Sequence, residues 1–174
     1  MLMIDAEEGL TEQDKKIASL AHDKGRGIIF VLNKWDKMPQ DRFFLKKTTE
    51  KIHFQFGQMQ YAPIIPISAI NGTGVNKLIN IAIQMYEQLN TSIGTGQLNQ
   101  AMEKWMTETP PPSGPRTRFK IKYAVQKSSN PVKFIFFASR FQSVSNSYIS
   151  FLRNKIQKEL GFCYIPVLIE VKSS

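Results

Sequence analysis

Residues 27–36 read Gly27-Ile28-Ile29-Phe30-Val31-Leu32-Asn33-Lys34-Trp35-Asp36, an apolar run that passes directly into a polar tetrapeptide. An uninterrupted run of branched and aromatic residues is typical of a strand that is buried on both faces of a parallel sheet. In open parallel sheets, ligands bind beyond the carboxyl ends of the strands. This stretch therefore predicts both the fold class and the edge of the sheet at which a site should lie.

The sequence on either side of this stretch repeats the alternation of strand and helix. Thr11 and Asp14 have capping-box spacing, which favours a helix start there. Apolar runs predict strands, and apolar residues at helical spacing predict helices. In chain order, these strands and helices are expected at 1–4, 11–25, 27–32, 44–56, 63–67 and 75–89. The order predicts an α/β fold, with a parallel sheet that is covered by helices on both faces.

The tetrapeptide Asn33–Asp36 has the pattern N-K-x-D, which suits recognition of guanine. The Asp36 carboxylate can accept two hydrogen bonds, from the guanine N1–H and its 2-amino group, and adenine lacks this pair of donors. The Asn33 amide can contact the purine N7, and the stem of Lys34 can lie over the base. Ser68 and Ala69 follow the next strand and would offer backbone N–H groups to the guanine O6.

Chance alone explains this pattern poorly. An N-K-x-D match arises in roughly 2% of chains of this length at average residue usage. The requirement that it end one strand, with Ser68-Ala69 ending the next, lowers that frequency further. Trp35 is less specific, because a packing or surface tryptophan explains it equally well.

Three segments carry a family resemblance: Ile4–Asp14, Asn33–Asp36 and Pro66–Ala69. They resemble the ribosome-assembly GTPases of the Der (EngA) family, and the resemblance covers nearly the whole chain. That family has two tandem Ras-like P-loop GTPase domains followed by a KH-like domain. The resemblance implies the C-terminal half of the second GTPase domain over residues 1–92, followed by a small α+β KH-like domain over residues 93–174.

The resemblance also implies a ligand and its site. The ligand is GTP or GDP, the family's fourth G motif falls on Asn33–Asp36, and its fifth falls on Ser68-Ala69. Ile70 follows at a position where related GTPases vary. The candidate base-binding residues are therefore Asn33, Lys34, Trp35, Asp36, Ser68, Ala69 and Ile70.

The phosphate-binding motifs of GTPases do not occur in these 174 residues. There is no G-x-x-x-x-G-K-[ST], whose backbone cradles phosphates and whose Ser or Thr binds Mg²⁺. Both this motif and the D-x-x-G motif would precede Met1, as would the other GTPase domain. We therefore expect this chain to contact only the guanine base of the nucleotide and to have no catalytic or metal-ligating residue. Magnesium is expected only in a full-length protein, and the chain alone should not hydrolyse GTP.

The second half of the chain predicts a smaller α+β arrangement. Its expected elements are a helix ending before Pro110, strands at 119–125 and 132–138, a helix at 149–160 and a strand at 163–171. In the first of these strands, Tyr123 is expected on the apolar face and Ala124 on the exposed face. Three phenylalanines of the next strand could stack on bases, although core packing is the more common use of Phe134, Phe136 and Phe137. The G-x-x-G loop of ordinary KH domains is absent.

The positive charge is concentrated in this half. Residues 1–94 have a net charge of +1 and residues 95–174 have a net charge of +8. Lysine and arginine near phosphates release condensed counterions, so a basic surface favours a polyanionic partner. The candidate contacts to rRNA are Arg116, Arg118, Lys120 and Lys122, with a merely solvated basic surface as the alternative for each residue.

Three functions remain open. The preferred one is a GTP-binding protein of the Der family that acts in biogenesis of the large ribosomal subunit. We expect it to be cytoplasmic and monomeric. Its expected partners are the large ribosomal subunit or rRNA, and the missing GTPase domain. The second is a nucleotide-independent basic module that binds rRNA or a ribosomal protein, and the third is a structural role. One cysteine excludes a disulfide framework, and no apolar run is long enough to cross a membrane.

Overall fold

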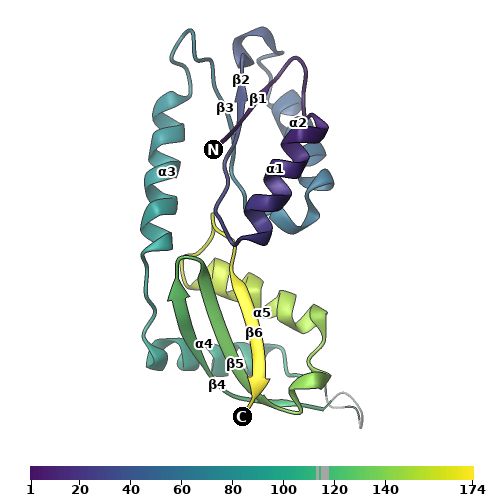
Figure 1. Cartoon of the computed structure of the whole chain (residues 1–174), viewed down its shortest axis with the longest axis vertical. Coiled ribbons are helices and arrows are strands. Elements are labelled where there is room, and N and C mark those ends of the chain that lie inside the picture. The colour runs from purple at the N-terminus through teal and green to yellow at the C-terminus, as the bar shows by residue number, and fades with distance from the viewer. Residues whose placement is uncertain (113, 115–117) are drawn as a thin grey trace. The chain divides into compact units, whose positions relative to one another are not determined.

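The computed structural model describes residues 1–112, 114 and 118–174. The chain divides into two compact units (Figure 1). The first unit comprises Met1–Glu87 with Tyr164–Pro166, and the second comprises Gln88–Cys163 with Val167–Ser174. Within the described residues, no helix combines the length and the apolar character needed to span a membrane.

The first unit is built on a parallel sheet with the strand order β1-β2-β3. Its strands are β1 (Leu2–Asp5), β2 (Phe30–Asn33) and β3 (Ile64–Pro66). In the central strand, Phe30 and Val31 are fully buried and Leu32 is 2% exposed. Burial from both faces explains why this strand is continuously apolar. The predicted parallel sheet is confirmed.

Helices cover both faces of this sheet: α1 and α2 lie on one face and α3 on the other (Figure 1). Their bounds are α1 (Glu12–Asp23), α2 (Arg42–Gln55) and α3 (Val75–Leu89). The predicted capping box opens α1, because the Asp14 N–H donates to Thr11 Oγ1 at 3.2 Å and the Thr11 N–H donates to Asp14 Oδ2 at 2.9 Å. The Asp41 carboxylate caps α2 by accepting from the Phe44 N–H at 2.6 Å.

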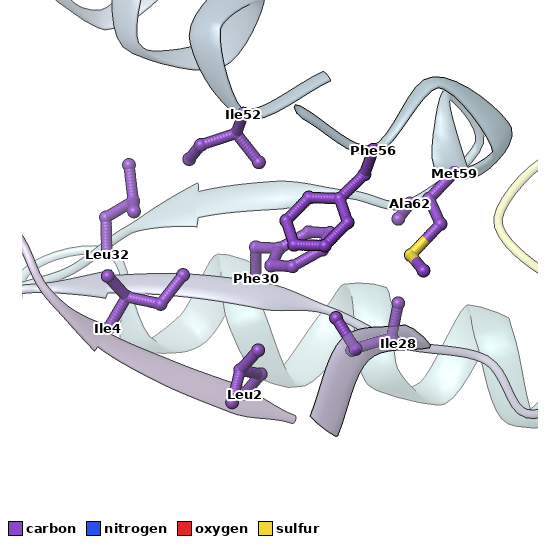
Figure 2. Packing of buried hydrophobic residues seen from close by; sticks show 10 residues of the cluster. Leu2, Ile4, Ile28, Phe30, Leu32, Ile52, Phe56, Met59 and Ala62 are labelled. Carbon is purple, nitrogen blue, oxygen red and sulfur yellow. The ribbon is translucent and has the colours of Figure 1, made fainter. Parts of the chain in front are cut away.

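A buried apolar cluster joins the sheet to α1 and α2 (Figure 2). At its centre, the rings of Phe30 and Phe56 stack with their centroids 5.1 Å apart. Its members are Leu2, Ile4, Ala18, Ile28, Phe30, Leu32, Ile52, Phe56, Met59 and Ala62. Each large side chain buried here contributes about 1.5–3 kcal/mol relative to an exposed one. This packing holds the strand ends, and therefore the loops that follow them, in fixed positions.

The second unit has the predicted order of helix, strand, strand, helix and strand. The elements are α4 (Thr95–Glu108), β4 (Lys120–Ser129), β5 (Val132–Ser139), η3 (Phe141–Ser143), α5 (Asn146–Glu159) and β6 (Leu168–Ser173). The sheet has the order β4-β5-β6, with β4 antiparallel and β6 parallel to the central β5. Phe134 and Phe136 are fully buried, which confirms core packing for these two rings.

The predicted alternation in β4 is wrong at Tyr123 and Ala124. Tyr123 is 44% exposed and Ala124 is fully buried, the reverse of the expectation. The reason is a β-bulge: Ile121 pairs with Ala138 and Tyr123 pairs with Phe137, so β4 has one residue more than β5 at this point. A bulge shifts the in–out alternation of every residue beyond it by one position.

The last strand also begins later than predicted. We expected it from Cys163, and the structure begins β6 at Leu168. Pro166 has no N–H to donate to a neighbouring strand, so regular pairing starts only beyond it. The Cys163 thiol is exposed and accepts a hydrogen bond from the Gln88 amide at 3.4 Å.

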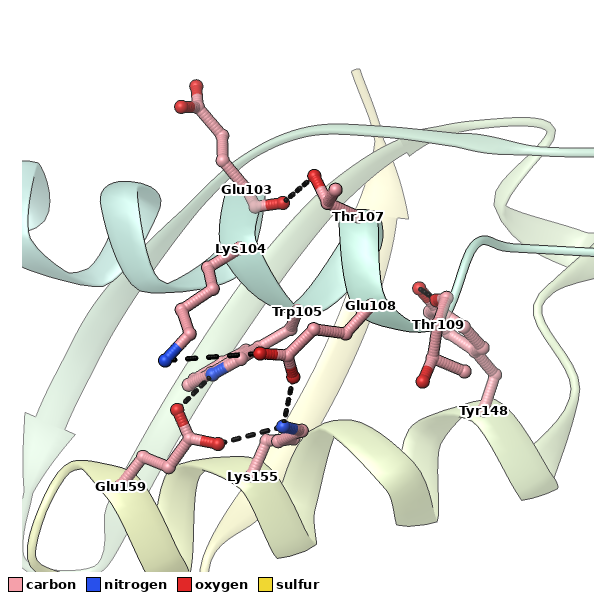
Figure 3. Close-up of polar contacts among 9 residues, drawn as sticks. All are labelled: Glu103, Lys104, Trp105, Thr107, Glu108, Thr109, Tyr148, Lys155 and Glu159. Atoms are coloured by element: carbon pink, nitrogen blue, oxygen red, sulfur yellow. Dashed lines mark hydrogen bonds and ion pairs between the residues drawn. The ribbon is translucent and has the colours of Figure 1, made fainter.

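Polar side chains link α4 to α5 (Figure 3). The buried Trp105 donates its indole N–H to Glu159 Oε2 at 2.7 Å. Lys155 donates to the other oxygen of Glu159 at 2.8 Å and to Glu108 Oε2 at 2.7 Å. Hydrogen bonds from Lys155 and then from Trp105 lower the pKa of Glu159, and the bond to Glu108 raises the pKa of Lys155.

Candidate functional site at the edge of the parallel sheet

The carboxyl ends of the three parallel strands bring the predicted polar clusters together. Asp5 at the end of β1 is in register with Asn33 at the end of β2, and Leu32 is in register with Pro66 of β3. Beyond these ends follow η1 (Trp35–Lys37) and the loop 67–74. Two segments separated by about thirty residues in the sequence are therefore neighbours in space, as expected for a parallel sheet.

Asn33 connects the two segments directly. Its side-chain oxygen Oδ1 accepts a hydrogen bond from the Ala69 N–H at 3.0 Å, and the Trp35 N–H donates to the Ile67 carbonyl at 3.0 Å. Among the residues that the structure describes, the Asn33 side-chain nitrogen has one weak contact, 3.8 Å from the Met3 sulfur. The oxygen of this amide thus holds the loop, while its nitrogen is available to an acceptor on a ligand.

The loop after β3 is closed by hydrogen bonds around Ser68, which is only 2% exposed. The Ser68 N–H donates to the Thr73 carbonyl at 3.0 Å, and its hydroxyl accepts from the Asn71 N–H at 3.3 Å. Gly74 has a φ of +79°, and a Cβ at this position would overlap the Pro66 carbonyl oxygen. Only glycine fits there without displacing the backbone.

Lys34 is held away from η1 by acidic residues at the end of β1. Its backbone has a φ of 61°, in the left-handed region, and its Nζ lies 2.5 Å from Asp5 Oδ2 and 4.0 Å from Glu7 Oε2. The hydrogen bond between them raises the pKa of Lys34 and lowers the pKa of Asp5, which also accepts from the Glu7 N–H. The stem of Lys34 is therefore fixed across the ends of β1 and β2.

Asp36 lies at a pocket of about 280 Å³ between η1 and the loop after β3. The pocket is lined by Trp35, Asp36, Gln40, Pro66, Ile67, Ser68, Asn71 and Thr73. The Asp36 side chain is exposed and forms no ion pair or hydrogen bond with any described residue. An uncompensated carboxylate beside a pocket can accept hydrogen bonds from a ligand that presents two donors.

The remaining predicted residues have different positions. Trp35 lines this pocket and also packs its ring against Phe44, with the centroids 5.7 Å apart, so it serves packing as well. Ile70 is 87% exposed and is not part of the pocket lining. The Ser68 and Ala69 N–H groups, which we expected to face a guanine oxygen, are both bonded within the protein in this structure.

Sequence reasoning missed two residues of this region. Gln40 donates from its amide to the Trp35 carbonyl at 2.5 Å and to the Met38 carbonyl at 2.7 Å, which closes one wall of the pocket. A single glutamine in a loop has no pattern that could have indicated this. Asp5 could have been found, because it ends an apolar run exactly as Asn33 does.

A second, larger pocket of the same unit has both apolar and charged residues in its lining, Glu7 and Lys51 among them. It measures about 350 Å³ and is bordered by β1, the loop after it and α2, with residues such as Ile4, Leu10 and Ile52 in its wall. Of the predicted site residues it includes only Trp35. The predicted base-binding residues Trp35, Asp36 and Ser68 instead line the smaller pocket together. No cluster of three or more metal-ligating side chains occurs among the described residues.

The basic candidates of the second unit lie near the start of β4. Arg116 falls outside the described residues. Arg118 is exposed and its N–H donates to the Gly114 carbonyl at 2.9 Å. Lys120 and Lys122 are exposed, and neither forms an ion pair within the described parts of the chain.

Two family models match the chain. Residues 1–88 match the elongation factor Tu GTP-binding domain, and residues 92–172 match the KH-domain-like C-terminal region of EngA bacterial GTPase enzymes. Solved structures of Era from Aquifex aeolicus bound to GDP·AlF₄⁻, and of Era in complex with MgGDPNP and a 16S rRNA fragment, cover 98% and 97% of this chain. Their TM-scores are 0.40 and 0.42, their identities are 19% and 18%, and the matches span 63% and 62% of those chains.

Curated relatives match over almost the full length of the chain. GTPase Der of Treponema pallidum is 35% identical over 100% of this chain and 38% of its own length. GTPase Der of Caldanaerobacter subterraneus is 39% identical over 99% of this chain and 39% of its own length. The chain thus spans about two-fifths of the length of these relatives. With a GTP-binding-domain match followed by an EngA KH-like match, the chain belongs to the Der (EngA) family of bacterial GTPases.

Proposed function

We propose that the first unit binds the guanine base of GTP or GDP, with Asp36 as the residue that selects guanine. The observation that carries this proposal is the position of the Asp36 carboxylate, which lies beside the 280 Å³ pocket without a partner among the described residues. The guanine N1–H and 2-amino group would donate to its two oxygens. Hydrogen bonds to a charged group contribute about 1.5–3 kcal/mol each, whereas adenine would leave the carboxylate unpaired.

The neighbouring residues would complete the base site. The Asn33 side-chain nitrogen, which has only the weak contact to Met3, would donate to the purine N7. The Lys34 stem, fixed by Asp5, would cover the base and the ribose edge. The Ala69 N–H would reach the guanine O6 only if it exchanged its bond to Asn33 for one to the base. Ser68 would hold the loop, and Ile70 would lie at the rim of the site.

We further propose that these 174 residues do not hydrolyse GTP by themselves. They contain no G-x-x-x-x-G-K-[ST], so no backbone cradle, lysine or magnesium-binding hydroxyl of this type is available to the phosphates. Base contacts alone should then bind GDP weakly, and magnesium should add little. In a full-length protein of the family, magnesium and the phosphates would be bound by residues outside this segment.

The test of guanine binding compares GDP with ADP by NMR titration of the whole chain. Wild type should show shifts around Trp35 and Ser68 with GDP and not with ADP. The Asp36→Ala variant should lose about ten-fold or more in GDP affinity. A matched control is Asp23→Ala, which removes an exposed carboxylate at the end of α1 and should bind GDP as wild type does. Equal binding of GDP and ADP by wild type would reject the proposal.

The second unit supports a further part of the proposed function, contact with rRNA during assembly of the large ribosomal subunit in the cytoplasm, by a monomer. The supporting observation is the net charge of +8 on residues 95–174, together with the exposed Lys120 and Lys122, which form no ion pair with any residue that the structure describes. Arg116 and Arg118 would extend the contact along the segment before β4. The second candidate function, a basic module that needs no nucleotide, would use the same contact.

Salt dependence tests the basic contact, and the effect of GDP on rRNA affinity separates the two candidates. Affinity for an rRNA fragment should fall steeply as salt is raised, and the double variant Lys120→Ala/Lys122→Ala should reduce the slope of log affinity against log salt by about one for each lysine. If GDP changes the rRNA affinity of wild type but not of Asp36→Ala, the nucleotide-dependent function is favoured. If GDP has no effect on either protein, the nucleotide-independent module is favoured.

A further inference from the structure

The β-bulge in β4 places an aromatic side chain on the sheet face opposite the core. Ile121 is 2% exposed and Ala124 fully buried, so both face the helices, while Lys122 and Tyr123 between them are exposed. In a regular strand Tyr123 would have pointed to the same side as Ile121. The additional residue, Lys122, is what directs Tyr123 outward.

Tyr123 stacks on Phe137 of the neighbouring strand. The ring centroids are 4.4 Å apart and the ring planes differ by 15°, which makes a nearly parallel pair. Phe137 is paired with Lys172 of β6, so these two side chains lie on one face of the sheet. Lys120 is paired with Ser139, which lies two residues beyond Phe137 on β5 and therefore on the same face. We call the five residues Lys120, Lys122, Tyr123, Phe137 and Lys172 the aromatic–lysine surface.

The charge of this surface is strongly unbalanced. Its lysines have one acidic neighbour on the sheet face, Glu170, which lies 3.3 Å from Lys172 and is also bonded to Lys133 at 2.7 Å. Hydrogen bonds from these two lysines lower the pKa of Glu170, so it is ionised and already paired. Lys120 and Lys122 have no acidic partner among the described residues. The partner with complementary charge is therefore a polyanion.

An exposed tyrosine that stacks on a half-buried phenylalanine, with lysines beside them, suits the chemistry of unpaired RNA. Bases that have left a helix stack on aromatic side chains, and the neighbouring phosphates are neutralised by lysine and arginine. A double helix keeps its bases stacked inside and offers no ring to such a surface. The chain has no G-x-x-G loop, so the usual KH grip on single strands is not available to it.

We propose that Tyr123 and Phe137 form a stacking platform for an unpaired base of single-stranded RNA, with Lys120 and Lys122 neutralising the adjacent phosphates. This inference rests on the proposed rRNA binding of the second unit and adds a mode of recognition to it. Stacking supplies affinity that does not depend on salt, whereas the lysines supply the salt-dependent part.

The experiment measures binding of the whole chain to a fluorescently labelled short oligouridylate over a series of salt concentrations. Tyr123→Leu should weaken binding by about five-fold to one-hundred-fold, since stacking contributes about 1–3 kcal/mol per base. Its salt slope should stay that of wild type. Tyr123→Phe should bind as wild type does, because it keeps the ring, and Phe137→Leu should weaken binding as Tyr123→Leu does.

Controls separate this inference from the proposal on which it rests. Tyr86→Leu removes an exposed tyrosine of α3 in the first unit and should leave binding unchanged, and thermal unfolding should show every variant folded. If binding depends on Lys120 and Lys122 but Tyr123→Leu binds as wild type, the stacking platform is rejected and rRNA binding stands. If wild type binds a folded rRNA fragment but not oligouridylate, the platform is likewise rejected. If wild type binds neither RNA, both proposals fail.

Discussion

In the first unit, the polar groups that we propose bind a nucleotide lie in loops at the carboxyl edge of a parallel sheet. In the second unit, the groups that we propose bind RNA lie on the face of a mixed sheet. In the first unit, helices cover both faces of the sheet, and β1 and β2 are apolar up to Asp5 and Asn33 at their ends. In the second unit, β4 has the exposed Lys122 and Tyr123 between its buried residues, and Tyr123 stacks on the half-buried Phe137 of β5. A proposed site therefore lies at the strand ends where the strands are buried, and can lie on the sheet face where a strand has exposed side chains.

The two units also differ in net charge, in the direction that the two proposals require. A site at a strand end needs a few polar groups in exact positions, and residues 1–94 are nearly neutral, at +1. A surface that attracts a polyanion needs excess positive charge over an area, and residues 95–174 have +8.

The largest expected effect tests whether the apolar central strand supports the first unit. Phe30→Ala should lower the free energy of unfolding by about 3–5 kcal/mol, because it empties a fully buried site and removes the stack on Phe56. Urea denaturation followed by Trp35 fluorescence, in a Trp105→Phe background, would measure the change. Phe54→Ala is the matched control: this ring is 89% exposed, and its loss should change stability by less than about 0.5 kcal/mol. Similar costs for both would contradict the packing described for this sheet.

An intermediate effect tests the loop that follows β3. Gly72 and Gly74 both have positive φ values, +72° and +79°, but only a Cβ at Gly74 would overlap backbone. Gly72→Ala should cost about 1–2 kcal/mol for the left-handed conformation. Gly74→Ala should cost about 1–3 kcal/mol more, because the Pro66 carbonyl must move. The same denaturation experiment measures the free energy of unfolding of both variants. Equal losses of stability would contradict the close contact between Gly74 and the Pro66 carbonyl.

The smallest effect concerns the second unit, where Lys155 and Trp105 lower the pKa of Glu159. Because the folded pKa lies below the ordinary one, the stabilisation from ionised Glu159 is fully present above the ordinary Glu pKa. It is lost as the pH falls through the folded pKa. Lys155→Met should return the Glu159 pKa toward its ordinary value in an NMR titration of side-chain carboxyl carbons. Lys158→Met, on an exposed neighbouring position of α5, should leave it unchanged; an unshifted Glu159 in Lys155→Met would rule out this cause.

The sequence predicted those features that depend on local patterns. The apolar run before Asn33 predicted the central strand, the Thr11–Asp14 spacing predicted the start of α1, and alternation along the chain predicted the parallel sheet. The bond between Asn33 and Ala69 follows from neighbouring strand ends, so the convergence of those two segments was also predictable.

Features that depend on pairing between distant residues were not predictable. The bulge at Lys122 arises from the register of β4 against β5, and a strand sequence alone does not specify where an additional residue is accommodated. The ion pair between Lys34 and Asp5 joins two strands, and the Gln40 bonds arise from the shape of its loop. None of these leaves a periodic or motif-like trace in the sequence.

The central claim, that the Asp36 carboxylate selects guanine, is tested most directly by exchanging its acceptor for a donor. In Asp36→Asn, the side-chain oxygen can accept from the N1–H of xanthine and the amide nitrogen can donate to its 2-carbonyl. The same amide nitrogen would face the 2-amino group of guanine, which is also a donor. Titration of wild type and Asp36→Asn with GDP and with xanthosine diphosphate should show a reversal of preference, with wild type favouring GDP and the variant favouring the xanthine nucleotide. If both proteins keep the same preference, the base does not lie against Asp36 and the account is contradicted.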